Sequence, residues 1–159
     1  MPNWCMNRLE VTGSEAEVKR FRELAEDPKG ECSQRYAPYP GISLKDQEGE
    51  KEGTVLCFNK LRPVPAELQA KEYDKGGYEW EVKNWGCKWG ASSAEVDDNS
   101  IKECGLLSYS FDTPWGPPEA LMGHISELFP GLEFELEWEE HWKRVWRGGK
   151  SFRGGTAGK

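Results

Sequence analysis

Residues 132–139 constrain the fold more than any other part of the chain. Apolar and acidic side chains alternate there without a break, in the order Leu, Glu, Phe, Glu, Leu, Glu, Trp, Glu. Successive side chains of a β-strand point to opposite faces of a sheet, so this segment can bury one face and expose a row of carboxylates on the other. The chain therefore needs an antiparallel sheet with one covered face and one face in water.

Three further segments are predicted to be strands. Residues 4–12 alternate with the period of two, and so do residues 107–111. Residues 54–58, with the sequence TVLCF, read as a short buried strand. Residues 145–148 are predicted to add a hairpin partner after the acidic strand.

Two helices are predicted between these strands. Ser14 followed by Glu17 forms a capping box, and apolar side chains recur on one helical face up to Ala25. Pro117-Pro118 opens a second helix, which ends before Pro130-Gly131. The order strand, helix, strand, repeated once, predicts an α+β fold of the ferredoxin-like, split βαβ type. It has a four-stranded antiparallel sheet with both helices on one face.

The length of 159 residues fits one domain. We expect a single domain over residues 1–148, with a tryptophan-rich insertion at 59–104 and a solvated surface excursion at 26–53. Residues 149–159 are rich in glycine and basic side chains, which predicts a flexible basic tail. Two Arg-Gly-Gly copies in residues 147–155 are also a weak pattern for single-stranded nucleic acid.

Charge favours a basic protein partner over nucleic acid. The net charge is −7, divided into −13 for residues 1–142 and +6 for residues 143–159. An acidic body repels phosphate backbones and attracts basic surfaces, so direct nucleic-acid binding is disfavoured. No segment approaches the ~20 apolar residues of a membrane span, and no secretory signal is visible at the start, so we expect a cytoplasmic protein without membrane contact.

Five blocks of uncommon residues carry a family resemblance. They are residues 1–7, 58–65, 84–89, 111–118 and 129–130, with the sequences MPNWCMN, FNKLRPVP, NWGCKW, FDTPWGPP and FP. Together they closely resemble the YubB-type family of ferredoxin-like-domain proteins found in phages and plasmids. The resemblance implies the ferredoxin-like fold with an inserted segment and a mobile-element origin in a bacterial host cell, and it implies no established activity. The chain departs from the family pattern at Cys87 and Trp138, where the family has threonine and tyrosine.

The acidic row is the first candidate site. Its members are Glu133, Glu135, Glu137 and Glu139. Neighbours in this row stand ~6.6 Å apart, which suits a catalytic acid/base pair, although a solvated sheet face explains the same row. A sharper interpretation is that the row mimics nucleic-acid phosphates and occupies the groove of a basic partner. The row also argues against an RNA-binding sheet, for which Trp4 and Met6 are the only stacking candidates.

A group of tryptophans is the second candidate site. Two indoles four residues apart, with an amide and an ammonium beside them, can sandwich a nucleotide or a small ligand. The alternative is that these large aromatics anchor the insertion to the sheet. The candidate ligand-binding residues are Asn84, Trp85, Lys88, Trp89 and Trp115.

No catalytic or metal-binding pattern is present in the sequence. The five cysteines are unpaired and lack a CxxC spacing, so neither a disulfide framework nor a zinc site is predicted. Only His124 and His141 can serve as imidazole bases for a nucleophile such as Cys87. We predict no cofactor, no metal and no enzyme activity.

Three function hypotheses remain, in this order. The first is a non-catalytic accessory protein of a phage or mobile element that binds a basic host protein, such as a nucleic-acid-binding effector. Its most concrete form is a counter-defence inhibitor of the anti-CRISPR type. The second is a sponge for a nucleotide or small molecule, and the third is an enzyme, with single-stranded nucleic-acid binding as a further alternative. An exposed edge beside the second strand can also pair two copies into a homodimer.

Overall fold

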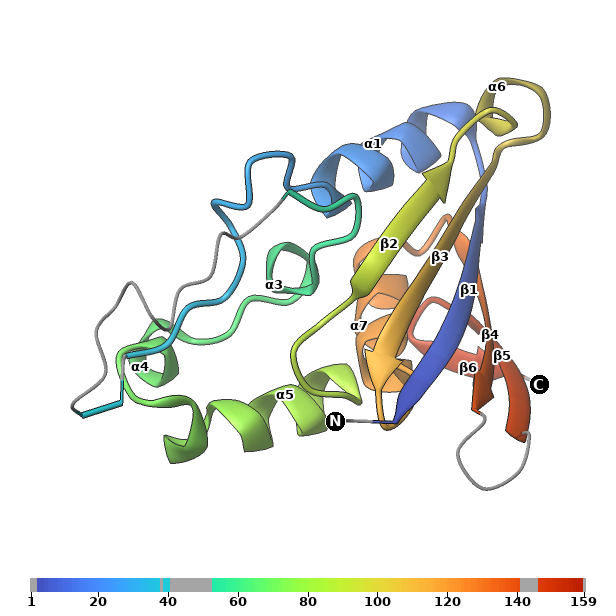
Figure 1. Ribbon diagram of the computed structural model, residues 1–159. Helices are drawn as coiled ribbons and strands as arrows, with labels where there is room; N and C mark the ends of the chain where they lie inside the picture. Colours follow the sequence, from blue (N-terminus) through green and yellow to red (C-terminus); the bar gives the residue numbers. More distant parts are fainter. Residues whose placement is uncertain (1–2, 38, 41–52, 141–145, 159) are drawn as a thin grey trace.

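The computed structural model describes residues 3–37, 39–40, 53–140 and 146–158. Within them the chain forms an antiparallel sheet of six strands in the order β2-β3-β1-β4-β5-β6 (Figure 1). The strands are β1 (Trp4–Thr12), β2 (Ser92–Asp97), β3 (Leu106–Pro114), β4 (Glu133–Glu140), β5 (Trp146–Arg153) and β6 (Thr156–Gly158).

The helices lie on one side of this sheet, and no described helix covers the other side (Figure 1). The two helices of the predicted repeat are α1 (Glu15–Ala25) and α7 (Glu119–Leu128). The others are α3 (Phe58–Leu61), α4 (Ala66–Gln69), the 3₁₀ helix η1 (Tyr73–Lys75), α5 (Gly77–Trp85) and α6 (Ile101–Cys104). The first four strands with α1 and α7 have the ferredoxin-like order. The hairpin partner predicted after the acidic strand is β5, which extends beyond the predicted residues, and β6 was not predicted.

Several predictions from the sequence are confirmed. The β1 strand covers the predicted residues and buries Leu9 and Val11. The Ser14 hydroxyl caps α1 by accepting a hydrogen bond from the Glu17 amide at 3.3 Å. Phe21 of this helix lies at the centre of the core and meets three aromatic rings edge-on. They are Tyr109, Phe129 and Phe134, at centroid distances of 6.2, 5.5 and 5.3 Å.

The strand predicted at residues 54–58 is wrong. Thr54 makes only an isolated bridge to Asp27, and Phe58 begins α3. Leu56 and Cys57 are buried because this segment packs into the core, not because it pairs in the sheet. The second strand of the fold is β2, so the insertion lies between α1 and β2 instead of at 59–104. Residues 41–52 of the predicted surface excursion lie outside the described residues.

The predicted tail at residues 149–159 is also wrong, because residues 149–158 form the end of β5, a turn and β6. Phe152 is 4% exposed and lies opposite Phe134. The turn uses Gly154 and Gly155, both with positive φ, and the Gly155 amide donates to the Ser126 hydroxyl of α7 at 2.9 Å. The apolar contact and this hydrogen bond attach the segment to the domain.

Candidate functional site

The sheet face that no described helix covers is strongly acidic, and we call it the acidic face. The four predicted glutamates of β4 lie on it, because Phe134 and Leu136 between them are buried. The strand register brings four further carboxylates onto the same face from β1, β2 and β3. The acidic face therefore consists of Glu10, Glu95, Asp97, Asp112, Glu133, Glu135, Glu137 and Glu139. Glu140, by contrast, belongs to the buried phase of β4.

Some of these carboxylates lie opposite like charges. Glu10 of β1 is the direct cross-strand neighbour of Glu135 of β4. Opposed like charges destabilise a sheet, so the fold gains nothing from this arrangement. Charges that the fold does not need, such as this pair, are candidates for binding.

Arginines neutralise part of the acidic face. Arg147 donates through Nε to the Glu139 carboxylate at 2.6 Å, and Arg8 pairs with Glu10 at 2.9 Å. Glu135 and Glu137 are exposed and have no ion-pair partner among the described residues. Unpaired negative charge is therefore exposed in the middle of β4.

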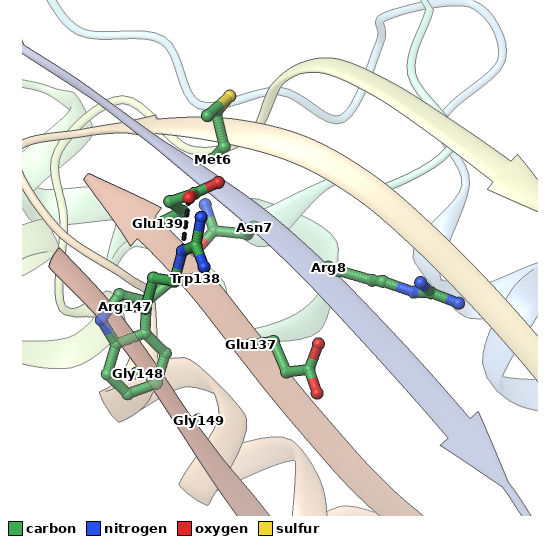
Figure 2. A pocket seen from close by; sticks show the side chains of 9 residues that line it. All are labelled: Met6, Asn7, Arg8, Glu137, Trp138, Glu139, Arg147, Gly148 and Gly149. Carbon is green, nitrogen blue, oxygen red and sulfur yellow. Dashed lines mark hydrogen bonds and ion pairs between the residues drawn. The ribbon is translucent and has the colours of Figure 1, made fainter. Parts of the chain in front are cut away.

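A hollow of about 620 Å³ opens on this face between β1, β4 and β5 (Figure 2). Its walls include Met6, Arg8, Glu137, Glu139 and Arg147, with Gly149 among the residues that line it. We call it the Gly149 hollow. Figure 2 shows the Arg8 side chain pointing along β1 away from Glu137, so these two cross-strand neighbours do not pair.

Exposed apolar side chains lie at one end of the acidic face. Trp4 is 38% exposed and Met6 45% exposed, and the period of β1 puts both on the outward side. Trp and Met are common in the centres of protein interfaces, where charged residues form the rim. Trp4 and Met6 beside a charged field resemble that arrangement.

The tryptophan group is divided between the core and the surface. Trp85 is fully buried, donates through Nε1 to the Arg62 carbonyl at 3.0 Å, and packs edge-on against Phe58 and Trp80. It anchors the insertion and cannot form one side of a ligand slot with Trp89. The sandwich expected between these two indoles is therefore wrong, because one of them is inside the core.

The other members of that group lie apart from such a slot. The Asn84 side chain donates to the Trp80 carbonyl at 2.9 Å, which is a local backbone contact. The Lys88 ammonium lies 4.1 Å from the ring centre of Trp89, which is 48% exposed. Trp115 is 53% exposed, and its backbone amide donates to the Asn3 carbonyl.

The cysteines and histidines do not form a catalytic pair in the described residues. Burial raises the pKa of Cys5 to about 12, and it also raises the pKa of the Cys57 and Cys87 thiols. Burial and the nearby Arg62 guanidinium lower the pKa of His124, and His141 lies outside the described residues. No group of three or more potential metal ligands was found in the part of the chain that the structure describes.

The structure also has a buried acidic group that the sequence does not reveal. Glu81 of α5 is 0% exposed and accepts hydrogen bonds from the Tyr36 hydroxyl, the Tyr73 hydroxyl (3.0 Å) and the Trp89 amide (2.7 Å). Its neighbour Glu79 is exposed, and no pattern in the sequence separates the two. All three donors come from the insertion, so Glu81 holds this part of the chain together.

Comparison with known proteins supports the fold. Residues 88–157 match the family model described as the ferredoxin-like domain in Api92-like protein. In this part the chain is similar to that domain. The matched residues run from the loop before β2 into β6. The ferredoxin-like fold that the family resemblance implied is confirmed for them.

The crystal structure of a protein api92 from Yersinia pseudotuberculosis has the same architecture. The TM-score is 0.66, and the alignment covers 100% of this chain and 98% of that chain at 12% sequence identity. At this identity the likeness concerns the fold alone. None of the curated proteins matches the chain. No described helix is long and apolar enough to cross a membrane.

Proposed function

We propose that the protein is a non-catalytic binding protein that uses the acidic face to hold a basic surface of another protein. The observation that carries this proposal is the set of eight carboxylates on the sheet side without helices, against the few arginines there. Electrostatic complementarity of this kind steers association and selects partners by charge. Trp4 and Met6 supply apolar contact area at one end of the same surface.

The charge of the acidic face favours a basic protein over nucleic acid as the partner. An RNA-binding sheet exposes stacking aromatics within a basic surround, whereas Glu10, Glu135 and Glu137 surround the middle of this sheet. Phosphates are repelled there. The row of carboxylates instead resembles a nucleic-acid strand in charge, so its preferred target is a nucleic-acid-binding protein.

The biological form of this activity follows from the family resemblance. A mobile-element protein in a bacterial cell that covers the nucleic-acid groove of a host effector acts as a counter-defence inhibitor. On this proposal the inhibitor and the effector's nucleic acid compete for one site. An effector that is preincubated with excess DNA or RNA is then expected not to bind the protein.

Charge reversal on the acidic face tests the proposal. The double variant Glu135→Lys, Glu137→Lys and the matched control Glu23→Lys, Glu79→Lys change the net charge equally. The control residues are exposed on helices α1 and α5, away from the face. Each variant and the unchanged protein serve as bait in a bacterial lysate at low and high salt.

We expect the unchanged protein and the control to retain the same basic protein at low salt, and the acidic-face variant to lose it. High salt should weaken the binding of the partner to the unchanged protein and to the control variant, because exposed charges are screened. Equal retention by all three baits would contradict the proposal. A nucleotide or a nucleic acid released from the bait, without a protein partner, would favour the alternative functions.

A further inference from the structure

Two adjacent glycines of β5 occur in the sheet for different reasons. A Cβ atom on Gly148 would lie 2.3 Å from Cζ2 of Trp138, so packing requires a glycine there. A Cβ atom on Gly149 would come no closer than 3.6 Å to the Glu137 side chain, which is an ordinary contact. Gly149 also does not have the positive φ that favours glycine.

The fold thus does not require glycine at position 149. A glycine inside a strand weakens the strand, and it often marks a place where another molecule approaches the backbone closely. Here it leaves the Gly149 hollow open, with a volume of about 620 Å³. A side chain at this position would point outward into the hollow, because Phe152 three residues later points inward.

The walls of the hollow select a long cationic side chain. Met6, 45% exposed, provides an apolar wall for an aliphatic stem. Glu137 provides a carboxylate without an ion-pair partner among the described residues, whereas Glu139 already accepts from Arg147 at 2.6 Å. Arginine combines a stem of this kind with a planar head that donates two parallel hydrogen bonds to a carboxylate.

We propose that the Gly149 hollow receives one arginine side chain of the basic partner, with its stem along Met6 and its guanidinium on Glu137. This inference rests on the proposed function and deepens it. The acidic face attracts the partner over a distance, and the hollow fixes where the partner docks. An anion is not the expected occupant, since the two arginines in the wall, Arg8 and Arg147, already pair with Glu10 and Glu139.

A titration followed by nuclear magnetic resonance tests the hollow without a known partner. The probe is N-acetyl-arginine amide. We expect saturable shifts of the Gly149 amide and the Met6 methyl signals in the millimolar range. N-acetyl-norleucine amide, which has a stem but no cationic head, and inorganic phosphate should both leave these signals unchanged.

Two variants test the geometry and the charge separately. Gly149→Val places a branched side chain in the hollow without changing charge and suits a strand, and Glu137→Gln removes the charge with little change in shape. Each is expected to weaken binding of the arginine probe about tenfold, the effect of losing one hot-spot contact. The matched control Ser108→Val adds the same kind of side chain to the same face on β3, opposite Glu10, which does not line the hollow, and should bind as the unchanged protein does.

Unchanged probe binding by Gly149→Val or by Glu137→Gln would overturn the inference, and so would stronger shifts with phosphate than with the arginine probe. Such a failure is distinguishable from failure of the proposed function. Loss of partner capture in the Glu135→Lys, Glu137→Lys variant concerns the whole face, whereas the probe reports on the hollow alone.

Discussion

At the scale of single residues, Glu81 shows how an irregular insertion obtains a fixed structure. Its carboxylate accepts from hydroxyls and an amide that belong to three separate segments. Burial, with a further contribution from Glu81, raises the pKa of Tyr36 and Tyr73. Both phenols therefore stay protonated and continue to donate.

Glu81→Gln is expected to destabilise the protein by about 1–3 kcal/mol, because an amide nitrogen would face groups that donate and leave one of them unsatisfied. Denaturant unfolding measures the change. Glu79→Gln, on the same helix but exposed, is the control and should have no effect. Equal unfolding curves for the two variants would show that Glu81 does not stabilise the insertion.

The cysteines should divide into two reactivity classes. Cys32 and Cys104 are exposed, whereas Cys5, Cys57 and Cys87 are buried with raised pKa values. At pH 8 a thiol reagent should therefore label two thiols per folded chain and five after denaturation. Fast labelling of all five thiols in the folded protein would contradict the burial of the other three.

The three buried thiols, those of Cys5, Cys57 and Cys87, make the free energy of unfolding depend on pH. Their pKa is higher in the folded chain than in the unfolded chain, so the unfolded chain loses these protons first as pH rises. Their contribution is complete below about pH 8.5, the usual thiol pKa, and declines above it. A Cys5→Ala variant should lose less stability than the unchanged protein between pH 8 and 11, as measured by denaturant unfolding.

At the scale of elements, the pattern of burial decides what a sequence reveals. The β1 and β4 strands were predictable because one face of β1 is fully buried, and one face of β4 is buried except for the partly buried Trp138. The β2 strand was missed because it is an edge strand whose inward residues, Ala94 and Val96, are only partly buried. The β5 strand was missed beyond residue 148 because two glycines interrupt its alternating pattern. Phe152 alone, among its side chains whose burial is described, is a buried apolar residue, which is too few to form a pattern.

The candidate site also has one part that a local sequence pattern predicts and another part that it does not. The row from Glu133 to Glu139 follows from strand period alone. The contributions of Glu10, Glu95 and Asp112 depend on register between distant strands, which no local pattern reports. The openness of the hollow depends on the space around Gly149, and a glycine in the sequence does not tell whether packing requires it.

Phe152→Ala tests whether β5 and β6 are part of the domain. Phe152 is 4% exposed, so truncating it should cost about 3–5 kcal/mol, the usual effect for a buried phenylalanine. The control Arg153→Ala, exposed on the same strand, should cost much less. A flexible tail would instead give two identical unfolding curves.

We expect the charge of the β2 edge to control self-association. A two-fold pairing of β2 with the same strand of a second copy would place Glu95 and Asp97 of the two chains close together. We therefore expect a monomer at low ionic strength, with any dimer favoured by added salt. Light scattering after size-exclusion chromatography measures this, and a dimer that salt dissociates would contradict it.

At the scale of the whole molecule, the described helices cover one side of the sheet and the acidic face is on the other (Figure 1). On the proposed function, binding and folding therefore use different faces. Charges on the open face can therefore change without disturbing the core. Glu135→Lys should even stabilise the protein by ~0.2–1 kcal/mol at low salt, since it places a cation opposite Glu10. Thermal unfolding at two salt concentrations measures the gain, which should shrink at high salt, and a loss of stability at low salt would contradict it.

The central position of β1 also determines when this chain can fold during synthesis. Its two neighbours in the sheet, β3 and β4, begin at Leu106 and Glu133, so the ribosome releases β1 long before either neighbour exists. Until then its apolar side, with Leu9 and Val11, has no sheet to join. Contacts between such distant segments slow folding, and they make the nascent chain a natural client for chaperones that shield extended apolar segments.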